Sequence, residues 1–227
     1  MSICSHDLLL SHGVPTYWGM RFGYFALLLG FLFAASPLQA QTLHILAFGD
    51  SLTAGLGLDP AQAFPARLEA ALKARGHDIV IANAGVSGDT TSAGAERLDW
   101  SLVPEIDGVI VELGANDALR GIDPDATEKA LDAILAELRK RKLPVLFAGM
   151  LAPRNLGPDY GKKFDAIFPR LAQKYSVLFY PFFLDGVAAD PAFNQPDGLH
   201  PNSKGVDMIV SRILPITEDL LKQVSSK

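Results

Sequence analysis

One serine of this chain stands where a catalytic nucleophile is expected. Ser51 lies in the stretch AFGDSLTAG at 47–55, directly after an apolar run, and a serine on a strand-to-helix turn exposes its hydroxyl for attack on a carbonyl. The nucleophile turn of lipases requires glycine two residues after the serine, whereas Thr53 occupies that position here. A serine that only caps the following helix would stand in the same place. The stretch therefore gives two hypotheses for Ser51, which its partners must separate.

A serine nucleophile needs a base, and a carboxylate that orients the base. Three histidines follow the N-terminal leader: His44, His77 and His200. His44 opens the first expected strand and His77 ends a helix at the same end of the sheet, so neither is expected near Ser51. His200 is expected at the opposite end, and Asp197 precedes it by three residues with a glycine between. This spacing predicts Ser51, Asp197 and His200 as catalytic residues; the alternative is that Asp197 caps the final helix while His200 acts alone.

The elements that must position these residues alternate along the chain. Short apolar or β-branched runs, separated by segments of helical period, stand at 43–48, 78–83, 107–113, 144–149 and 176–182. This alternation predicts an α/β fold, with helices on both faces of a five-stranded parallel sheet. Such sheets bind ligands beyond the carboxyl ends of their strands. Four polar clusters are expected at that edge: Ser51, NAGVSGD at 83–89, GAND at 114–117 and DGLH at 197–200.

Helices are expected between the strands and after the last one. Capping residues and apolar periodicity place them at 60–75, 124–141, 164–175 and about 203–224. The segment 150–163, MLAPRNLGPDYGKK, is expected to be a long loop because it holds two prolines and two glycines. Pro215 is expected to kink or split the last helix.

Composition excludes several classes of function. The chain has 227 residues, 49% hydrophobic, which suits one domain, expected at 41–227. Its net charge of -5 is spread along the chain without a lysine or arginine block, so no nucleic-acid partner is expected. The only cysteine, Cys4, lies in the leader, and no two histidines have the spacing of a zinc site. We therefore expect no metal and no cofactor.

The first 40 residues have the pattern of a leader. Met20-Arg21 precedes an uncharged run at 22–35, which fits the apolar region of a signal peptide and is shorter than the roughly 20 residues of a membrane span. This predicts cleavage after Ala40 and a secreted or periplasmic protein without stable membrane insertion. The alternative is an uncleaved membrane helix, and Leu38 departs from the small residue usual at a cleavage site. Translation from either Met1 or Met20 is compatible with the pattern.

The motifs at the polar edge, taken in order, resemble the four blocks of the SGNH, or GDSL, hydrolase family. These motifs are GDSL at 49–52, Gly85 in NAGVSGDT, Asn116 in GAND, and DGLHPN at 197–202. With VELGANDALRG at 111–121, the mature chain is most similar to the secreted thioesterase/lysophospholipase and arylesterase branch. The resemblance implies a flavodoxin-like three-layer α/β/α fold and an oxyanion hole formed by the amides of Ser51 and Gly85 and the side chain of Asn116. In this family the serine is followed by a helix that does not require glycine at the position of Thr53.

The residues alone leave structural alternatives open. Gly85 and Gly88 are also suited to backbone turns, and Asn116 with Asp117 to a turn pair. Asp50 is interpreted as a hydrogen-bonding residue of the turn rather than as a catalytic acid.

We expect a serine esterase that opens small carboxylic esters or thioesters, with an acyl or aryl group, through an acyl-Ser51 intermediate. Apolar residues beside the polar edge are expected to bind that group: Leu119, Met150, Leu151, Leu156 and Tyr160. A carbohydrate O-acetylesterase, with the same catalytic residues and a polar cleft, is the first alternative. A non-catalytic binding module is the second. The mature protein is expected to be a monomer.

Overall fold

The computed structural model describes residue 1 and residues 42–226, so the expected leader and its cleavage site lie outside the described residues. Residues 42–226 contain a five-stranded, all-parallel sheet with the strand order β2-β1-β3-β4-β5. Its strands are β1 (Leu43–Gly49), β2 (Ile79–Gly85), β3 (Gly108–Glu112), β4 (Val145–Ala148) and β5 (Leu178–Tyr180). This is the flavodoxin-like order, and the expected α/β fold is confirmed.

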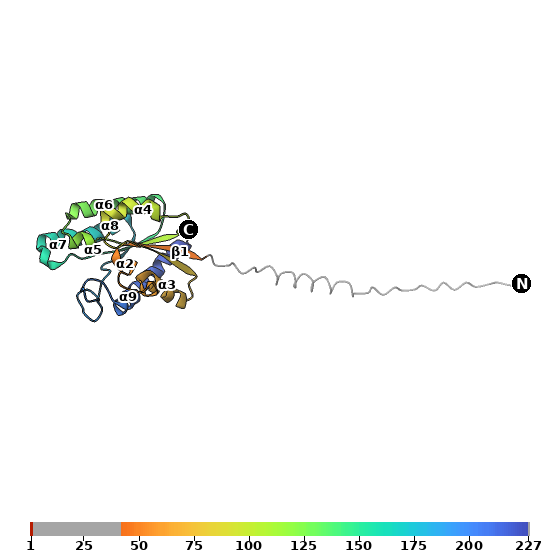
Figure 1. Cartoon of the computed structure of the whole chain (residues 1–227). Helices are drawn as coiled ribbons and strands as arrows, with labels where there is room; N and C mark the ends of the chain where they lie inside the picture. The colour runs from red at the N-terminus through yellow and green to blue at the C-terminus, as the bar shows by residue number, and fades with distance from the viewer. Residues whose placement is uncertain (2–41, 227) are drawn as a thin grey trace. The chain divides into compact units, whose positions relative to one another are not determined.

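Helices cover both faces of the sheet (Figure 1). In Figure 1, α4, α6 and α8 lie on one face, and α3 and α9 lie on the other. The helices of the described part are α2 (Ser51–Ala54), α3 (Phe64–Ala74), α4 (Thr91–Ser101), α5 (Ala115–Leu119), α6 (Pro124–Lys140), α7 (Pro158–Asp165), α8 (Ile167–Tyr175) and α9 (Ser203–Ser225), with 3₁₀ turns η1 (Pro60–Gln62) and η2 (Arg154–Leu156).

The central strands hold the site in a rigid core. Every residue of β3 and β4 is buried, as expected for parallel strands covered on both faces. Aromatic rings fill the layer between β4 and the helices beside it: the ring centres of Phe147 and Phe168 lie 5.5 Å apart, and Phe164 meets Phe168 edge-on at 5.5 Å. The carboxyl ends of the strands are thereby fixed relative to one another.

Two expectations about local structure were wrong. The segment 150–163 contains η2 and the first residues of α7, because Pro158 follows Gly157 at a position where proline favours the start of a helix. Of the two outcomes expected at Pro215, a kink or a split, the split is wrong, because α9 continues from residue 203 to residue 225. Buried residues on both sides of the proline, Ile213 and Leu220 among them, hold the two halves to the same core, and this packing outweighs the lost backbone hydrogen bond.

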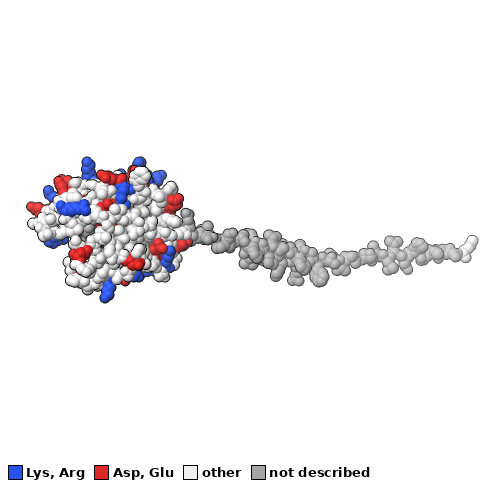
Figure 2. Space-filling view, viewed as in Figure 1, with Lys and Arg blue, Asp and Glu red and all other residues white. Residues whose placement is uncertain are grey.

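Charged side chains of both signs are interspersed over the visible face of the folded part (Figure 2). Neither sign forms a continuous field on that face. Among the described residues, no helix combines the length and the apolar character needed to cross a membrane.

Candidate active site

The structure brings Ser51, His200 and Asp197 into one hydrogen-bonded chain. Ser51 Oγ lies 2.9 Å from His200 Nε2, and His200 Nδ1 lies 2.6 Å from Asp197 Oδ2. Ser51 begins α2 directly after β1, whereas the other two residues come from the segment between β5 and α9. The contact therefore joins residues 149 positions apart in the sequence. Serine, imidazole and carboxylate in this order form the arrangement that activates a hydroxyl as a nucleophile.

A tight turn fixes Asp197 as an anion under the imidazole. Its Oδ1 accepts the backbone N–H groups of Leu199 at 2.9 Å and His200 at 3.0 Å, which leaves Oδ2 for the ring. The amide of His200, then that of Leu199, then the His200 ring lower the pKa of Asp197 to about 2. Asp197 is therefore ionised at neutral pH and is bonded to the histidine, instead of capping α9, which Asn202 caps.

Asp50 holds the turn that presents the nucleophile. Its buried carboxylate accepts the backbone N–H of Leu52 at 3.0 Å and caps α2, so the interpretation of Asp50 as a turn residue agrees with its contacts. The backbone N–H of Ser51, at the first position of α2, has no partner within that helix. No acceptor for this amide is found among residues 42–226 either, so it can donate to a ligand beside the Ser51 hydroxyl.

Asn116 lies at the start of α5, directly after β3. One N–H of its side chain donates to Asp50 Oδ2 at 3.1 Å, and the residue lines the same cavity as Ser51 and His200. The second N–H of the amide is left to bind a ligand. The neighbouring Asp117 is buried and accepts the backbone N–H and the hydroxyl of Thr91 at 2.8 and 2.6 Å, so it ties α4 to α5.

Gly85 does not offer a free amide to this site. Its N–H donates to Asn83 Oδ1 at 2.9 Å, and a Cβ at this position would lie 2.2 Å from the nitrogen of Ala54. Glycine is therefore required here by the close approach of β2 to α2. Gly88, in the same loop, has a left-handed φ of 87°, and its N–H has no acceptor among the described residues. The loop is tied to β1, because the N–H of Val86 donates to the carbonyl of Gly49 at 3.0 Å.

An apolar cavity of about 570 Å³ opens beside Ser51 and His200. Three of the five residues expected to bind substrate line it: Leu119, Met150 and Leu151. Leu52, Phe182, Leu184 and Leu199 also contribute to its wall, and Arg154 is the one lysine or arginine among its lining residues. Such a cavity suits the hydrocarbon part of a small substrate.

Leu156 and Tyr160 are not among the residues that line this cavity. The Tyr160 hydroxyl donates to the carbonyl of Ile122 at 2.8 Å, and its ring stacks on Phe164 at 5.9 Å. Helix α7 turns this side chain into the protein, which the expectation of a loop did not foresee. The wall residues Phe182 and Leu184 were not among the predicted binding residues, because the sequence gives no sign of which side of their segment faces the cavity.

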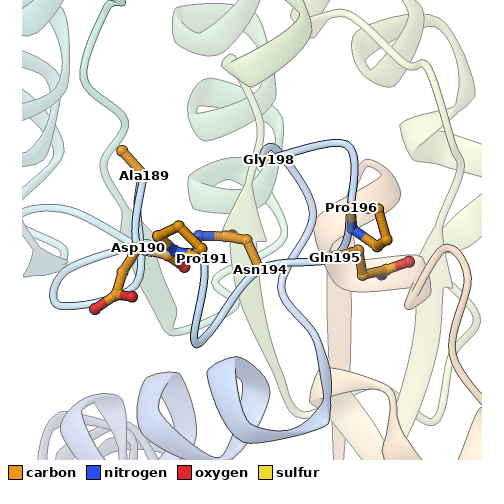
Figure 3. A pocket seen from close by; sticks show the side chains of 7 residues that line it. All are labelled: Ala189, Asp190, Pro191, Asn194, Gln195, Pro196 and Gly198. Atoms are coloured by element: carbon orange, nitrogen blue, oxygen red, sulfur yellow. Dashed lines mark hydrogen bonds between the residues drawn. The ribbon is translucent and has the colours of Figure 1, made fainter.

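A second, smaller pocket of about 350 Å³ adjoins the cavity and shares Ala189 and Gly198 with it. Figure 3 shows the side chain of Asn194 within the loop that lines this pocket, on the side of Asp190 and Pro191. The amide of Asn194 donates to the carbonyls of Val187 at 2.6 Å and Asp190 at 2.9 Å. These bonds stiffen the segment that leads into Asp197 and His200.

The donor set at this edge of the sheet fits acyl transfer. The hydrogen-bonded pair of Ser51 and His200 has the groups that acyl transfer needs as nucleophile and base, and Asn116 lines the same cavity. Among residues 42–226, no three or more His, Cys, Asp or Glu side chains are grouped so that they could hold a metal ion.

Comparisons with known proteins agree with this chemistry. The model of the GDSL-like Lipase/Acylhydrolase family matches residues 47–208. The chain is 39% identical to the Thioesterase 1/protease 1/lysophospholipase L1 of Escherichia coli K12, with 82% of this chain and 85% of that protein covered. It is 35% identical to Esterase TesA of Pseudomonas aeruginosa, over 81% of this chain and 92% of that protein.

Among solved structures, the chain is similar to AlinE4, an SGNH-hydrolase family esterase. The two are 47% identical with a TM-score of 0.67, and 80% of this chain and 97% of that chain are covered. The family match includes Ser51, Asn116, Asp197 and His200. The sequence resemblance is therefore confirmed, and this chain belongs to the GDSL-like lipase/acylhydrolase, or SGNH hydrolase, family.

Proposed function

We propose that this protein hydrolyses small carboxylic esters and thioesters through a covalent acyl-Ser51 intermediate. The observation that carries the proposal is the 2.9 Å contact between Ser51 Oγ and His200 Nε2 at the wall of an apolar cavity. Family membership and the named esterases and thioesterase among its relatives support an ester-hydrolysing enzyme.

In the proposed reaction, His200 Nε2 takes the hydroxyl proton as Ser51 Oγ attacks the ester carbonyl. The tetrahedral intermediate collapses, the bond to the alcohol or thiol breaks, and the imidazolium returns the proton to that leaving group. Water then attacks the acyl-Ser51 carbonyl with His200 again as base, which releases the acid and restores the serine hydroxyl. Asp197 holds the ring and stabilises its cationic form.

Three N–H donors are proposed for the oxyanion hole. The amide of Ser51 and the free side-chain N–H of Asn116 keep the roles that the sequence indicated. For the third donor we propose Gly88 rather than Gly85, because the N–H of Gly85 is bonded to Asn83 whereas that of Gly88 has no acceptor in the described part.

The cavity favours substrates with an apolar acyl or aryl group. Leu119, Met150 and Leu151 lie on its wall with Phe182 and Leu184, and a carbohydrate would find few hydrogen-bond partners there. This argues for the esterase over the O-acetylesterase alternative.

Hydrolysis of p-nitrophenyl esters of graded acyl length, by purified residues 41–227, tests this function. Each methylene that enters the cavity is expected to raise kcat/KM by about 3- to 4-fold, from a gain of about 0.8 kcal/mol per buried CH₂, until the cavity is full. Turnover of the acetyl ester alone would support the O-acetylesterase instead. Absence of turnover on every ester would contradict the enzyme assignment and favour a binding module.

The location and assembly of the enzyme are part of the same proposal. We propose that residues 1–40 direct export and are cleaved after Ala40, on the basis of the apolar run at 22–35. We propose a monomer in the periplasm or the medium, since Ser51, Asn116, Asp197 and His200 all come from one chain.

A further inference from the structure

A buried acid that the proposed reaction does not use lies directly behind the nucleophile. Glu112 ends β3 and has no exposed surface. Its neighbours across the sheet are Gly49 on β1 and Ala148 on β4, two of the smallest residues. A Cβ on Gly49 would lie 2.7 Å from Glu112 Oε2 and 2.1 Å from the hydroxyl of Thr53. The absence of a side chain at Gly49 therefore makes the space that this carboxyl occupies.

Within residues 42–226, the one side chain that hydrogen-bonds this carboxyl belongs to the helix that carries Ser51. Thr53 Oγ1 donates to Glu112 Oε2 at 2.7 Å, and Thr53 stands two residues after Ser51 on α2. Glu112 Oε1 is buried and has no hydrogen-bond partner among the described residues. A buried acid with one unsatisfied oxygen opposes folding. The stability of the fold therefore does not explain why an acid stands at position 112. The contact of Glu112 with α2 gives it a role in holding the helix that carries Ser51.

A second buried acid connects the same place to the oxyanion hole. Asp50 has no exposed surface, and it accepts the N–H of Leu52 and one N–H of the Asn116 side chain. Burial raises the pKa of Asp50 to about 6. Burial, and then the charge of Asp50, raise the pKa of Glu112 well above its usual value. Two adjacent buried acids oppose each other's ionisation. Asp50 accepts two N–H bonds that favour its charged form, so it loses its proton first and Glu112 holds its proton to higher pH.

Other charged groups act on this pair from neighbouring elements. His200 favours the charged form of Asp50, and Asp117 on α5 disfavours it. Arg97 on α4 donates to the carbonyl of Gly49 at 2.8 Å and pairs with Asp89 at 2.5 Å. The guanidinium of Arg97 is thus bound to Asp89 and the Gly49 carbonyl, and not to Asp50 or Glu112.

We propose that Glu112 is a positioning residue, whose neutral buried carboxyl anchors α2 through Thr53 and so fixes Ser51 against the oxyanion donors. The inference rests on the proposed ester hydrolysis. Loss of the anchor should misplace the Ser51 hydroxyl while the cavity stays intact, so kcat should fall and KM should not. Ionisation of Glu112 at alkaline pH should also lower kcat. It places a second negative charge beside Asp50 and so disturbs the hydrogen bond between Asp50 and Asn116.

Thr53→Val tests the anchor, because valine keeps the shape of threonine and removes the hydroxyl. Its kcat for p-nitrophenyl acetate should fall by about 10- to 100-fold, the cost of a misplaced catalytic group, with KM within about 3-fold. Thr217→Val is the matched control: Thr217 is equally buried, and its hydroxyl donates to the carbonyl of Ile213 on α9, away from the site. The control should keep its kcat. Equal kcat in the wild type and a folded Thr53→Val variant would overturn the proposal.

Glu112→Gln tests the role of the proton. Glutamine keeps an oxygen for the Thr53 hydroxyl and cannot ionise, so this variant should keep at least about a third of the wild-type kcat at neutral pH. In kcat profiles from about pH 6 to about pH 10, the wild type should lose activity at the alkaline end and Glu112→Gln should not. An unchanged alkaline fall in Glu112→Gln would contradict the proposal. Failure of the proposed function would look different, since the wild type itself would then not turn over the ester.

Discussion

Replacing Ser51 with alanine is expected to lower kcat by about 10⁶-fold, the size of loss seen when the nucleophile of a serine protease is removed. Alanine removes the oxygen that would form the acyl bond, and no cysteine is present after residue 4 to replace it. Steady-state hydrolysis of p-nitrophenyl butyrate measures the effect. Ser211→Ala is the control, because the Ser211 hydroxyl bonds the carbonyl of Met208 on α9 and its loss should leave kcat unchanged.

The loss of kcat in Ser51→Ala should not add to the loss of kcat in His200→Ala. In the proposed mechanism His200 is the base that activates Ser51, so Ser51→Ala in combination with His200→Ala should be little worse than either change alone. His77→Ala is the control on the histidine side, since His77 lies near Glu218, 3.4 Å from its carboxylate. Two losses that multiply would show that Ser51 and His200 act independently, which the 2.9 Å contact between them does not predict.

Asn116→Asp is expected to lower kcat by at least about 100- to 1,000-fold, or roughly 3 to 4 kcal/mol of lost transition-state stabilisation. The change keeps the shape of the side chain and replaces its N–H donors with a negative charge. That charge would face both the developing oxyanion and the carboxylate of Asp50, whose Oδ2 lies 3.1 Å from the Asn116 amide nitrogen. KM should change much less, because the N–H bonds the oxygen most strongly in the transition state.

Two further variants sharpen this test. Asn116→Ala should be no more damaging than Asn116→Asp, since it removes the donor without adding the charge. Asn155→Asp, at an exposed residue of η2, adds the same charge nearby and should leave kcat unchanged. A folded Asn116→Asp enzyme with more than about a tenth of the wild-type kcat would return Asn116 to a purely structural role.

The sheet and the catalytic contacts could be predicted from the sequence for a physical reason. Parallel strands buried on both faces leave long apolar runs in the sequence, and the order of those runs places Ser51, Asn116 and His200 at one edge of the sheet. The DGLH turn is local, so the distance from Asp197 to His200 follows from three residues of spacing.

The partners that single side chains and backbone N–H groups find in the fold could not be predicted in the same way. The N–H of Gly85 in NAGVSGD is occupied by a side chain, that of Asn83, and the sequence does not show this bond. Tyr160 faces Phe164 instead of the cavity because α7 begins at Pro158, inside the expected loop. The role inferred for Glu112 depends on its contact with Thr53, 59 positions away, which the sequence does not display.

Labelling with a p-nitrophenyl alkylphosphonate tests most directly the claim that Ser51 is a nucleophile activated by His200. Such a reagent forms a stable phosphonyl ester with an activated serine and releases one p-nitrophenolate. We predict one label per inactivated molecule, located by peptide mass spectrometry on Ser51, with labelling at least about 100-fold slower in His200→Ala. A label on another residue, or labelling of Ser51 at the same rate without His200, would contradict this account.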